Sequence, residues 1–331
     1  MGIIKESLYK IAAGGILSLF KNQSVFPYYH LVRNDKVAHI ENLYPYKNID
    51  QFRSDIDLLL QTYKPLEPKE LLQQVKTKNC FLLTFDDGLE EIYSVIFPIL
   101  KEKNIKAVFF INPDFVDNKQ SLYKHDISLI INYLAHRGFK ASEVDRVCAI
   151  LEIENANSND LIQKIKSTPY AQRNKIKQVA TALGLDVNGY LGSQRPYISK
   201  SQIAEMLEAG FYFGGHTLSH PPLVQLTHEQ QKAEIIGSIE WVKTNFDVSY
   251  AMFAFPFSDK GISRRLIDEL FEYDPNLLLF GNSGLKKDVH SRIIQRFSLE
   301  NPKRLPGKLI VSENLYKFYN QLTGQYKLKR R

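Results

Sequence analysis

Two adjacent carboxylates stand at the end of an apolar segment in the N-terminal third of the chain. Thr84-Phe85-Asp86-Asp87-Gly88 directly follows Cys80-Phe81-Leu82-Leu83, which is apolar enough to form a buried strand. Burying acidic side chains is costly unless they are paired, hydrogen bonded or bound to a metal. Gly88 allows the backbone to turn so that both acids can face one cleft. Because Asp-Asp-Gly turns are also common in solvated loops, this run alone does not decide between a site and a turn.

Two histidines four residues apart form a second motif. Gly214-Gly215-His216-Thr217-Leu218-Ser219-His220-Pro221 follows the short apolar stretch 211–213. A single helical turn of backbone would place both imidazoles on one side, within reach of one ion. Imidazole nitrogens suit zinc, and a carboxylate as third ligand leaves a coordination position open for water or substrate. Together, the acidic pair and the histidine pair predict a catalytic metal site.

At these residues the chain resembles the polysaccharide deacetylase family, also called the NodB-homology or carbohydrate esterase family 4 group. In that family the first Asp of the acidic pair is the general base, and the second Asp and the two histidines bind a divalent metal, usually zinc. The resemblance therefore implies that Asp86 is the base and that Asp87, His216 and His220 bind the metal, most simply Zn²⁺. It covers about residues 24–117 and 196–300.

A third match is Phe253-Ala254-Phe255-Pro256-Phe257, which resembles the Arg-x-Pro-aromatic strand end of the family. Ala254 occupies the arginine position, so this chain departs from the family pattern there. Some branches of the family carry Phe-x-aromatic-Pro versions of this motif and are still hydrolases. The residue that orients the base is therefore not evident from this motif.

The same residues allow metal-assisted hydrolysis of an acyl bond. A bound divalent ion polarises a carbonyl oxygen and lowers the pKa of a bound water. Asp86 adjoins the ligand Asp87 but lies outside the metal shell, so it can accept the proton of the attacking water. The oxyanion needs a donor besides the metal, and the Phe257 N–H is the candidate because Pro256 fixes the local turn.

An amine leaving group also needs a proton, and histidine is its usual donor. Among the eight histidines we favour His30, which follows the β-prone run 25–29 and so falls near a strand end. The Tyr-His pair also resembles the first strand of a permuted branch of the family, in which the acid histidine comes from the N-terminal strand. His290 is the rival, because it lies near the place of the acid in the unpermuted pattern. A purely structural histidine that caps a strand is the alternative for His30.

Length and composition predict a soluble enzyme with one main domain. The 331 residues are 44% apolar and 24% charged, as is ordinary for a globular protein. Cys80 and Cys148 show no metal-ligand spacing, and we expect reduced, buried thiols, which fits a cytosolic protein. We expect no nucleic-acid partner, because only the net charge of +7 would suggest one. An iron oxygenase could use the same ligand types, but it would leave Asp86 without a role.

Residues 1–23 are expected to form an amphipathic helix with lysines on its flanks. Its uncharged part, 11–20, is too short to span a bilayer, and Glu6 and the missing small-residue cleavage site argue against a signal peptide. Packing on the protein body is the plainer expectation, and lying on a membrane surface is the sharper one. The basic tail 327–331 favours contact with an anionic membrane. We expect a cytoplasmic protein that can lie on the inner face of the membrane, and a periplasmic location stays open.

Strand-like and helix-like segments alternate along most of the chain, which implies a parallel sheet, open or closed into a barrel. Because the motifs end three separate strands, a barrel with its site at the carboxyl rim is favoured. The resemblance implies the same fold, a distorted (β/α)7 barrel. We expect strands at 107–111, 211–213, 250–255 and 276–280, and helices at 48–63, 89–103, 201–209, 227–245 and 263–273.

The alternation stops between residues 118 and 195, where helical, polar segments take over. We expect a helical insertion in a barrel of residues 24–310, followed by a C-terminal helix and basic tail at 311–331. The insertion could be a lid, a substrate-recognition element or a plain structural extension.

The leading prediction is a metal-dependent hydrolase that removes N-acetyl, or another small N-acyl group, from amino sugars of a glycan or its precursor. The basic character would suit an anionic glycan, a nucleotide-linked sugar or a lipid-linked sugar. An O-acetyl glycan esterase is the close alternative, because ester and amide cleavage use the same metal-water chemistry. A non-catalytic carbohydrate-binding module on the same barrel is a third reading, against which the complete Asp-Asp and His-His set argues.

Overall fold

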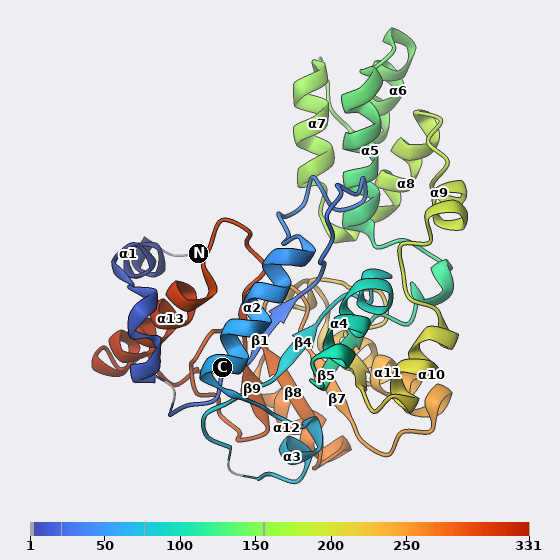
Figure 1. Ribbon diagram of the computed structural model, residues 1–331. Coiled ribbons are helices and arrows are strands. Elements are labelled where there is room, and N and C mark those ends of the chain that lie inside the picture. Colours follow the sequence, from blue (N-terminus) through green and yellow to red (C-terminus); the bar gives the residue numbers. More distant parts are fainter. Residues whose placement is uncertain (1–2, 21, 76, 155, 331) are drawn as a thin grey trace. The chain divides into compact units, whose positions relative to one another are not determined.

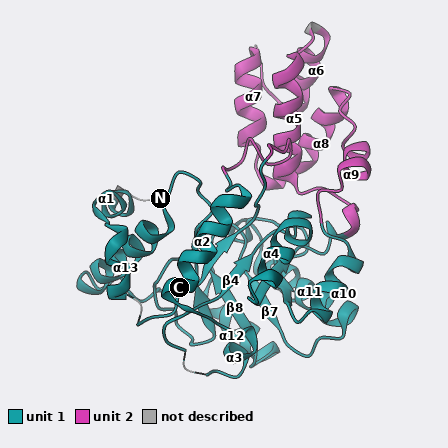
Figure 2. Ribbon diagram, in the orientation of Figure 1, with its two compact units in different colours: residues 1–34, 46–116, 198–331 teal, residues 35–45, 117–197 magenta. Residues whose placement is uncertain are grey.

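The computed structural model describes residues 3–20, 22–75, 77–154 and 156–330. The chain divides into two compact units (Figure 2). Unit 1 contains residues 1–34, 46–116 and 198–331, and unit 2 contains residues 35–45 and 117–197.

Unit 1 is a barrel of parallel strands surrounded by helices (Figure 1), which confirms the predicted fold class. Arg296 alone separates the last two strands in the sequence, one of which pairs with β8 and the other with β1. These two strands therefore act as one bent strand that joins the two ends of the sheet. The expected seven strands become eight because this strand is broken at Arg296. In order around the sheet, the strands are β10 (Phe297–Ser298), β1 (Pro27–Tyr29), β4 (Leu83–Phe85), β5 (Ala107–Ile111), β6 (Tyr212–Gly215), β7 (Met252–Ala254), β8 (Leu278–Gly281) and β9 (Ile293–Gln295).

The strands are short, and their side chains are mostly buried on both faces. One face packs an aromatic stack, in which Phe109 lies 5.1 Å from Phe85 and 5.3 Å from Phe213 between ring centroids. Strands buried on both faces need near-continuous apolar runs, which explains why the sequence pattern of β5 was clear. A separate two-stranded sheet pairs β2 (Lys64–Pro65) with β3 (Cys80–Phe81).

Several helices of unit 1 begin at polar residues whose side chains cap them. Asn48 and Thr227 form capping boxes with Gln51 and Gln230, and so start the first and the longest helix around the barrel. The segment expected as one helix at 89–103 instead makes a π-helical turn at Ile92–Ile96 before α4, because Pro98 lacks the N–H of a regular α-helix. The helices are α2 (Ile49–Thr62), α3 (Pro68–Leu72), α4 (Phe97–Glu102), α10 (Lys200–Glu208), α11 (His228–Phe246), α12 (Arg264–Tyr273) and α13 (Pro306–Leu322).

The N-terminal segment packs on α13 as two short pieces instead of the single expected helix. These are α1 (Ile3–Ile11) and the 3₁₀ helix η1 (Gly14–Phe20), while residues 1, 2 and 21 lie outside the described part. The break lies at residues 12–13, and Gly14 follows it in ordinary contact with Gly307 and Lys308 of α13. The C-terminal helix begins at Pro306 and not at 311, because proline fits the first helical turn. In the described ranges, every helix is too short or too polar to cross a membrane.

Unit 2 is helical and has its own core. Residues 35–45 lie against α5 (Tyr123–Arg137), where the Ser128 hydroxyl donates a hydrogen bond of 2.6 Å to the Ala38 carbonyl. Buried aromatic contacts include His125, which stacks on Tyr197 and is hydrogen bonded to its hydroxyl at 2.7 Å. The insertion expected at 118–195 thus lies within unit 2, which also takes in residues 35–45. Its other helices are α6 (Ala141–Leu151), α7 (Ser158–Ser167), α8 (Arg173–Ala182) and α9 (Val187–Gln194).

Both cysteines are free thiols, but the expectation that they are buried is wrong. Cys80 and Cys148 are only half-buried. Cys80 lies in β3, which pairs with β2 on one edge and is bridged by Val25 on the other.

Candidate metal and proton-transfer site

Three side chains that the sequence singles out as metal ligands lie together at the carboxyl ends of the strands. Asp87 follows β4, and His216 follows β6. Asp87 Oδ1 is 3.3 Å from His216 Nε2 and 3.1 Å from His220 Nε2. All three side chains are buried, and one ligand atom from each lies within 4.8 Å of the others. This spacing allows all three to reach one cation.

The hydrogen bonds around these residues suit a metal site. His216 Nδ1 is 2.8 Å from the Ala254 carbonyl, which can only accept, so Nδ1 carries a proton and Nε2 is the nitrogen that faces Asp87. Among the described residues, buried Asp87 Oδ1 has no hydrogen-bond donor of good geometry. Burial raises the pKa of Asp87, but the nearby His220 and His216 outweigh it and hold that pKa well below its usual range. An ionised, unsatisfied carboxylate oxygen facing two imidazole nitrogens fits a divalent cation.

The two histidines meet through a loop and not through the helical turn that the sequence suggested. Thr217 and His220 adopt left-handed backbone conformations, with φ of 68° and 56°. Asn112, which follows β5, donates hydrogen bonds to the His216 and Thr217 carbonyls, and the Thr217 hydroxyl accepts one from the His220 N–H at 3.1 Å. These side-chain bonds replace the helical bonds and hold the loop in its irregular shape.

Asp86 is oriented by an arginine that the sequence motifs did not reveal. Arg296 donates two parallel hydrogen bonds to the Asp86 carboxylate, at 2.8 and 2.9 Å. Its guanidinium is fully buried, and it also donates to the Thr84 hydroxyl at 2.8 Å. Burial raises the pKa of Asp86, but the Arg296 charge outweighs it and keeps that pKa below its usual value. Asp86 is therefore held as an ionised carboxylate in a fixed orientation.

The family motif places its arginine at the position of Ala254, but here the arginine comes from the break between β9 and β10. The signal in the sequence was weak: one charged residue inside the otherwise strand-like run 293–298. Because lone charges on strands usually face solvent, that pattern did not indicate a buried role.

His30 follows β1 and is held by a buried carboxylate. Its Nδ1 lies 2.7 Å from Glu300 Oε2, and the backbone N–H groups of His30 and Leu31 donate to Glu300 Oε1 at 2.9 and 2.8 Å. Burial alone would lower the pKa of His30, but the Glu300 charge outweighs it, with help from Asp87 and Asp86, and raises that pKa to about 10. The ring is therefore protonated at neutral pH and carries a proton on each nitrogen.

His290, the rival candidate, lies elsewhere. It precedes the N-terminal end of β9, whereas the metal ligands follow the carboxyl ends of their strands. Its ring packs on Phe271 of α12 with 4.0 Å between centroids. The structure thus brings Asp86, Asp87, His216, His220 and His30 into one electrostatically coupled group and leaves His290 outside it.

Phe257, the predicted source of the oxyanion N–H, adjoins the metal ligands. Its ring packs edge-on against His220 with 4.6 Å between centroids. The residue has a left-handed backbone (φ 53°), and its carbonyl accepts a hydrogen bond of 2.7 Å from the Asn282 side chain. A non-glycine residue in this conformation is strained unless its surroundings hold it, which is common at functional sites.

Comparison with known proteins identifies a family for the sequence and similar structures for the fold. The sequence model described as polysaccharide deacetylase matches residues 73–130 and 162–276, just over half of the chain. The fold is similar to that of the deacetylase PplD of Streptococcus pyogenes, solved with acetate, with 16% identity, a TM-score of 0.54 and coverage of 88% of this chain and 98% of that one. The fold is also similar to that of IcaB of Ammonifex degensii, with 17% identity and a TM-score of 0.53, and the match covers 88% of this chain and 97% of that one. A de-N-acetylase of Aggregatibacter actinomycetemcomitans has 14% identity and a TM-score of 0.51, with 85% of this chain and 96% of that one covered. A search of curated protein sequences found no match.

Proposed function

We propose that this chain, which belongs to the polysaccharide deacetylase family, removes N-acetyl or other small N-acyl groups from amino sugars of a glycan or glycan precursor. As a member of that family it is a hydrolase. The proposal for amide cleavage rests on one observation: Asp86, held by Arg296, and His30, held by Glu300, follow two paired strands beside a group of three candidate metal ligands.

Each side chain has a chemical task in such a reaction. Zn²⁺ held by Asp87, His216 and His220 would supply a more acidic water and a polarised acyl carbonyl. Asp86, fixed by Arg296, accepts the proton of the attacking water. The Phe257 N–H donates to the oxyanion.

His30 favours an amide over an ester substrate. An amine leaves a tetrahedral intermediate only after its nitrogen is protonated, and His30 is protonated at neutral pH because of Glu300. An alkoxide can leave with less help. O-acetyl esterase activity is therefore the second candidate.

The test measures bound metal together with acetate release. The purified protein would be loaded with Zn²⁺ and incubated with N-acetylated chito-oligosaccharides and with O-acetylated xylan. We expect one bound Zn²⁺ and acetate from the N-acetylated substrate, loss of acetate release in Asp86→Asn, and normal release in the exposed control Asp145→Asn. Acetate from xylan alone would establish the esterase instead. A zinc-loaded protein inert on both would overturn the proposal.

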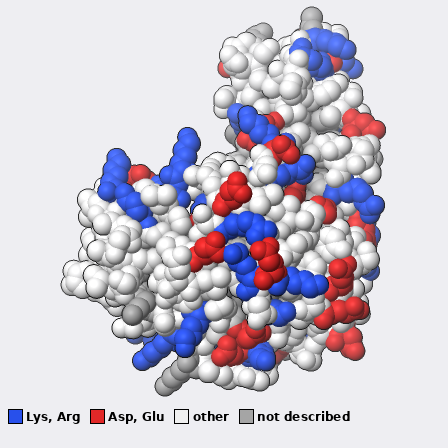
Figure 3. All heavy atoms as spheres, viewed as in Figure 1, with Lys and Arg blue, Asp and Glu red and all other residues white. Residues whose placement is uncertain are grey.

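We also propose that unit 1 binds an anionic membrane surface through the layer of α1, η1 and α13. Figure 3 shows the surface over α13 largely without charged atoms, with Lys and Arg side chains, and some acidic atoms, over α1 and at the margins. From residue 301 to 330, Glu313 is the only acidic residue, and it is paired with Lys5 at 2.7 Å. Apolar side chains framed by cations suit the surface of an anionic bilayer. Most of the exposed large apolar side chains in the described ranges belong to this layer: Ile4, Ile11, Ile16, Leu19, Leu305, Phe318 and Leu322.

Flotation with vesicles tests this contact without any need for activity. We expect the chain to float with vesicles of phosphatidylcholine and phosphatidylglycerol, and the variant Leu19→Ser/Phe318→Ser to float about tenfold less, because two of the exposed side chains are lost. Val224→Ser, an exposed apolar residue outside the layer, is the matched control. A chain that stays unbound, or a concentration-dependent dimer that the double variant dissolves, would refute membrane binding. On this proposal the chain would act at the cytoplasmic face of the inner membrane.

A further inference from the structure

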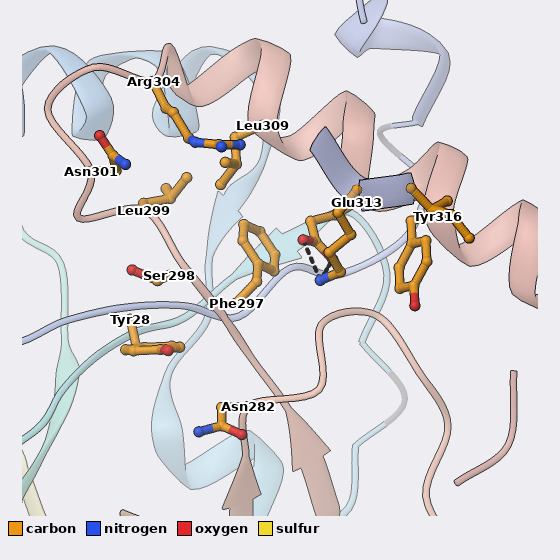
Figure 4. A pocket seen from close by; sticks show the side chains of 12 residues that line it. Tyr28, Asn282, Phe297, Ser298, Leu299, Asn301, Arg304, Leu309, Glu313 and Tyr316 are labelled. Carbon is orange, nitrogen blue, oxygen red and sulfur yellow. Dashed lines mark hydrogen bonds and ion pairs between the residues drawn. The ribbon is translucent and has the colours of Figure 1, made fainter. Parts of the chain in front are cut away.

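A pocket of about 1030 Å³ opens in unit 1 beside the proton-transfer residues (Figure 4). Tyr28 and Asn282 lie at one end, and Asn301 and Arg304 lie at the other. Side chains of α1 and α13 complete its wall. The volume is at the upper end of the range of ordinary small-molecule sites.

Two lining residues connect this pocket with the candidate site. The Tyr28 ring lies edge-on to the His30 ring with 5.5 Å between centroids, and the Arg296 guanidinium lies 4.9 Å from the centre of the Tyr28 ring. Asn282 donates to the Phe257 carbonyl at 2.7 Å. The pocket therefore begins next to the expected proton donor and next to the loop of the oxyanion donor.

The charged side chains in the wall neutralise one another. Lys5 pairs with Glu313 at 2.7 Å across the pocket wall, and Arg304 pairs with Glu6 of α1. A phosphate or diphosphate would have to compete with these carboxylates for the cations. What remains for a ligand is the aromatic side chains of Tyr28, Phe297 and Tyr316, the Asn301 amide and the Ser298 hydroxyl. This combination suits the apolar faces and hydroxyl groups of a neutral sugar.

The expected position of the leaving amine also places the next part of the substrate in this pocket. If His30 protonates the leaving amine, then the sugar ring that carries this nitrogen must lie on the His30 side of the site. The next part of the substrate then extends past Tyr28. All residues of the pocket wall lie outside 73–130 and 162–276, the segments that match the family.

We propose that this pocket binds a neutral sugar residue that adjoins the amino sugar being deacylated, so that oligosaccharides are preferred over monosaccharides. This inference rests on the proposed N-deacylation. It assigns the preference to α1, α13 and the segment after β10, which are parts of this chain beyond the family match.

The experiment compares acetate release from N-acetylglucosamine and from its β-1,4- and β-1,6-linked tetramers. We expect kcat/KM to be at least about tenfold higher for one of the tetramers than for the monomer, because sugar bound in the pocket helps to position the amide. Asn301→Ala and Ile4→Trp, which change the far end and the wall, should lower kcat/KM for that tetramer about tenfold and leave the monomer unchanged. Asn22→Ala and Ile16→Trp are matched controls outside the pocket.

The outcomes separate this inference from the function on which it rests. Equal kcat/KM for monomer and tetramers, or a tetramer preference that survives both pocket variants, would overturn the pocket assignment alone. Acetate release from none of the three sugars would overturn the proposed function and this inference with it. If a diphosphate-linked monosaccharide were the better substrate in the wild type and in both variants, the neutral-sugar assignment would be wrong.

Discussion

The two halves of the candidate site are built in different ways. In the metal half, the two histidines share one eight-residue motif, and the acidic pair supplies the third ligand. In the proton-transfer half, Asp86 is oriented by Arg296, 210 positions away, and His30 by Glu300, 270 positions away. Ligand identity is therefore a local property of this sequence, whereas the orientation of the base and the acid depends on long-range contacts.

One short segment provides both long-range contacts. Residues 293–300 contain β9, which pairs with β8, and β10, which pairs with β1, and thus close the barrel. Arg296 lies at the break between these strands, and Glu300 follows β10. The same segment therefore closes the barrel and orients both proton-transfer groups. We therefore expect variants of the metal half to lose metal, and variants of the proton-transfer half to lose turnover and keep metal.

Loss of a metal ligand should have the largest effect. His220→Ala removes one of three imidazole or carboxylate ligands, so we expect loss of bound Zn²⁺ and a fall in turnover on the order of a thousandfold. Metal analysis after dialysis, together with acetate release, measures both. His228→Ala, whose ring pairs with Glu269 on the surface of the barrel, should change neither. Full turnover by a metal-free His220→Ala protein would remove the metal half from the mechanism.

Substitution of the two rival histidines comes next. We expect His30→Ala to lose about a hundredfold or more in turnover, because general acid catalysis is lost, and to keep its metal. His290→Ala should change turnover little, since the ring packs on Phe271 away from the metal ligands. Measurements of acetate release at neutral pH and of metal content decide which histidine is the general acid. The reverse order would show that His290 is the acid.

Removal of Arg296 tests the substitute for the missing motif arginine. Arg296→Met leaves Asp86 buried without its partner, so we expect about 3–5 kcal/mol lower free energy of unfolding and about a hundredfold lower turnover with metal retained. Arg296→Lys keeps the charge but not the paired hydrogen bonds, so its stability and turnover should lie between those of the wild type and Arg296→Met. Arg292→Met is the matched control, because this buried arginine bonds to Asn276 and the Leu72 carbonyl and not to a carboxylate. Equal turnover losses in the two methionine variants would show that Arg296 is only structural.

Much of the fold was predictable because its signals are local. The buried strand 107–111 and the capped helix at 227–245 are nearly as expected, since apolar runs and capping boxes act over a few residues. The breaks were not predictable: the π-helical turn before Pro98, the break of the N-terminal helix before Gly14 and the split of the last strand at Arg296 depend on packing partners. For the same reason, the sequence suggested ligand and acid residues but not Arg296 or Glu300.

Glu300→Gln should change the pH dependence of turnover. Without that charge, only Asp86 and Asp87 still raise the pKa of His30, which should fall from about 10 toward its ordinary value. Because the general acid must be protonated to act, the alkaline limb of the pH profile of turnover should move to lower pH. If the pKa of His30 returns to about 6.5, turnover at pH 8 should be about thirtyfold lower. Metal content should not change.

The same pair should also affect stability. A raised folded-state pKa stabilises the protein fully below the unfolded pKa of His30, and this contribution is lost as the pH rises through about 10. The difference in unfolding free energy between wild type and Glu300→Gln should therefore shrink above neutral pH. An unshifted alkaline limb in the variant would argue against His30 as the acid.

The smallest effect on turnover is expected from Arg330, in the tail that the sequence suggested was free to meet a membrane. Its side chain is 3% exposed and donates to Asp288 at 2.8 Å and to Asp259 at 2.7 Å. Asp259 accepts from the Asn282 N–H, and Asn282 holds the Phe257 carbonyl. Arg330→Ala should thus loosen the oxyanion loop and lower kcat about fivefold to tenfold, with the His30 limb of the pH profile in place.

A tetrahedral phosphonate inhibitor distinguishes this positioning effect from general loss of stability. Its binding should weaken by the same factor as kcat/KM falls, because both depend on the donor to the oxyanion. Arg330→Lys should recover part of the loss, and Lys329→Ala, an exposed neighbour, should show none. If Arg330→Ala only lowers the melting temperature and binds the inhibitor normally, then the loop is held by Asn282 and its own backbone, and long-range orientation is confined to the base and the acid.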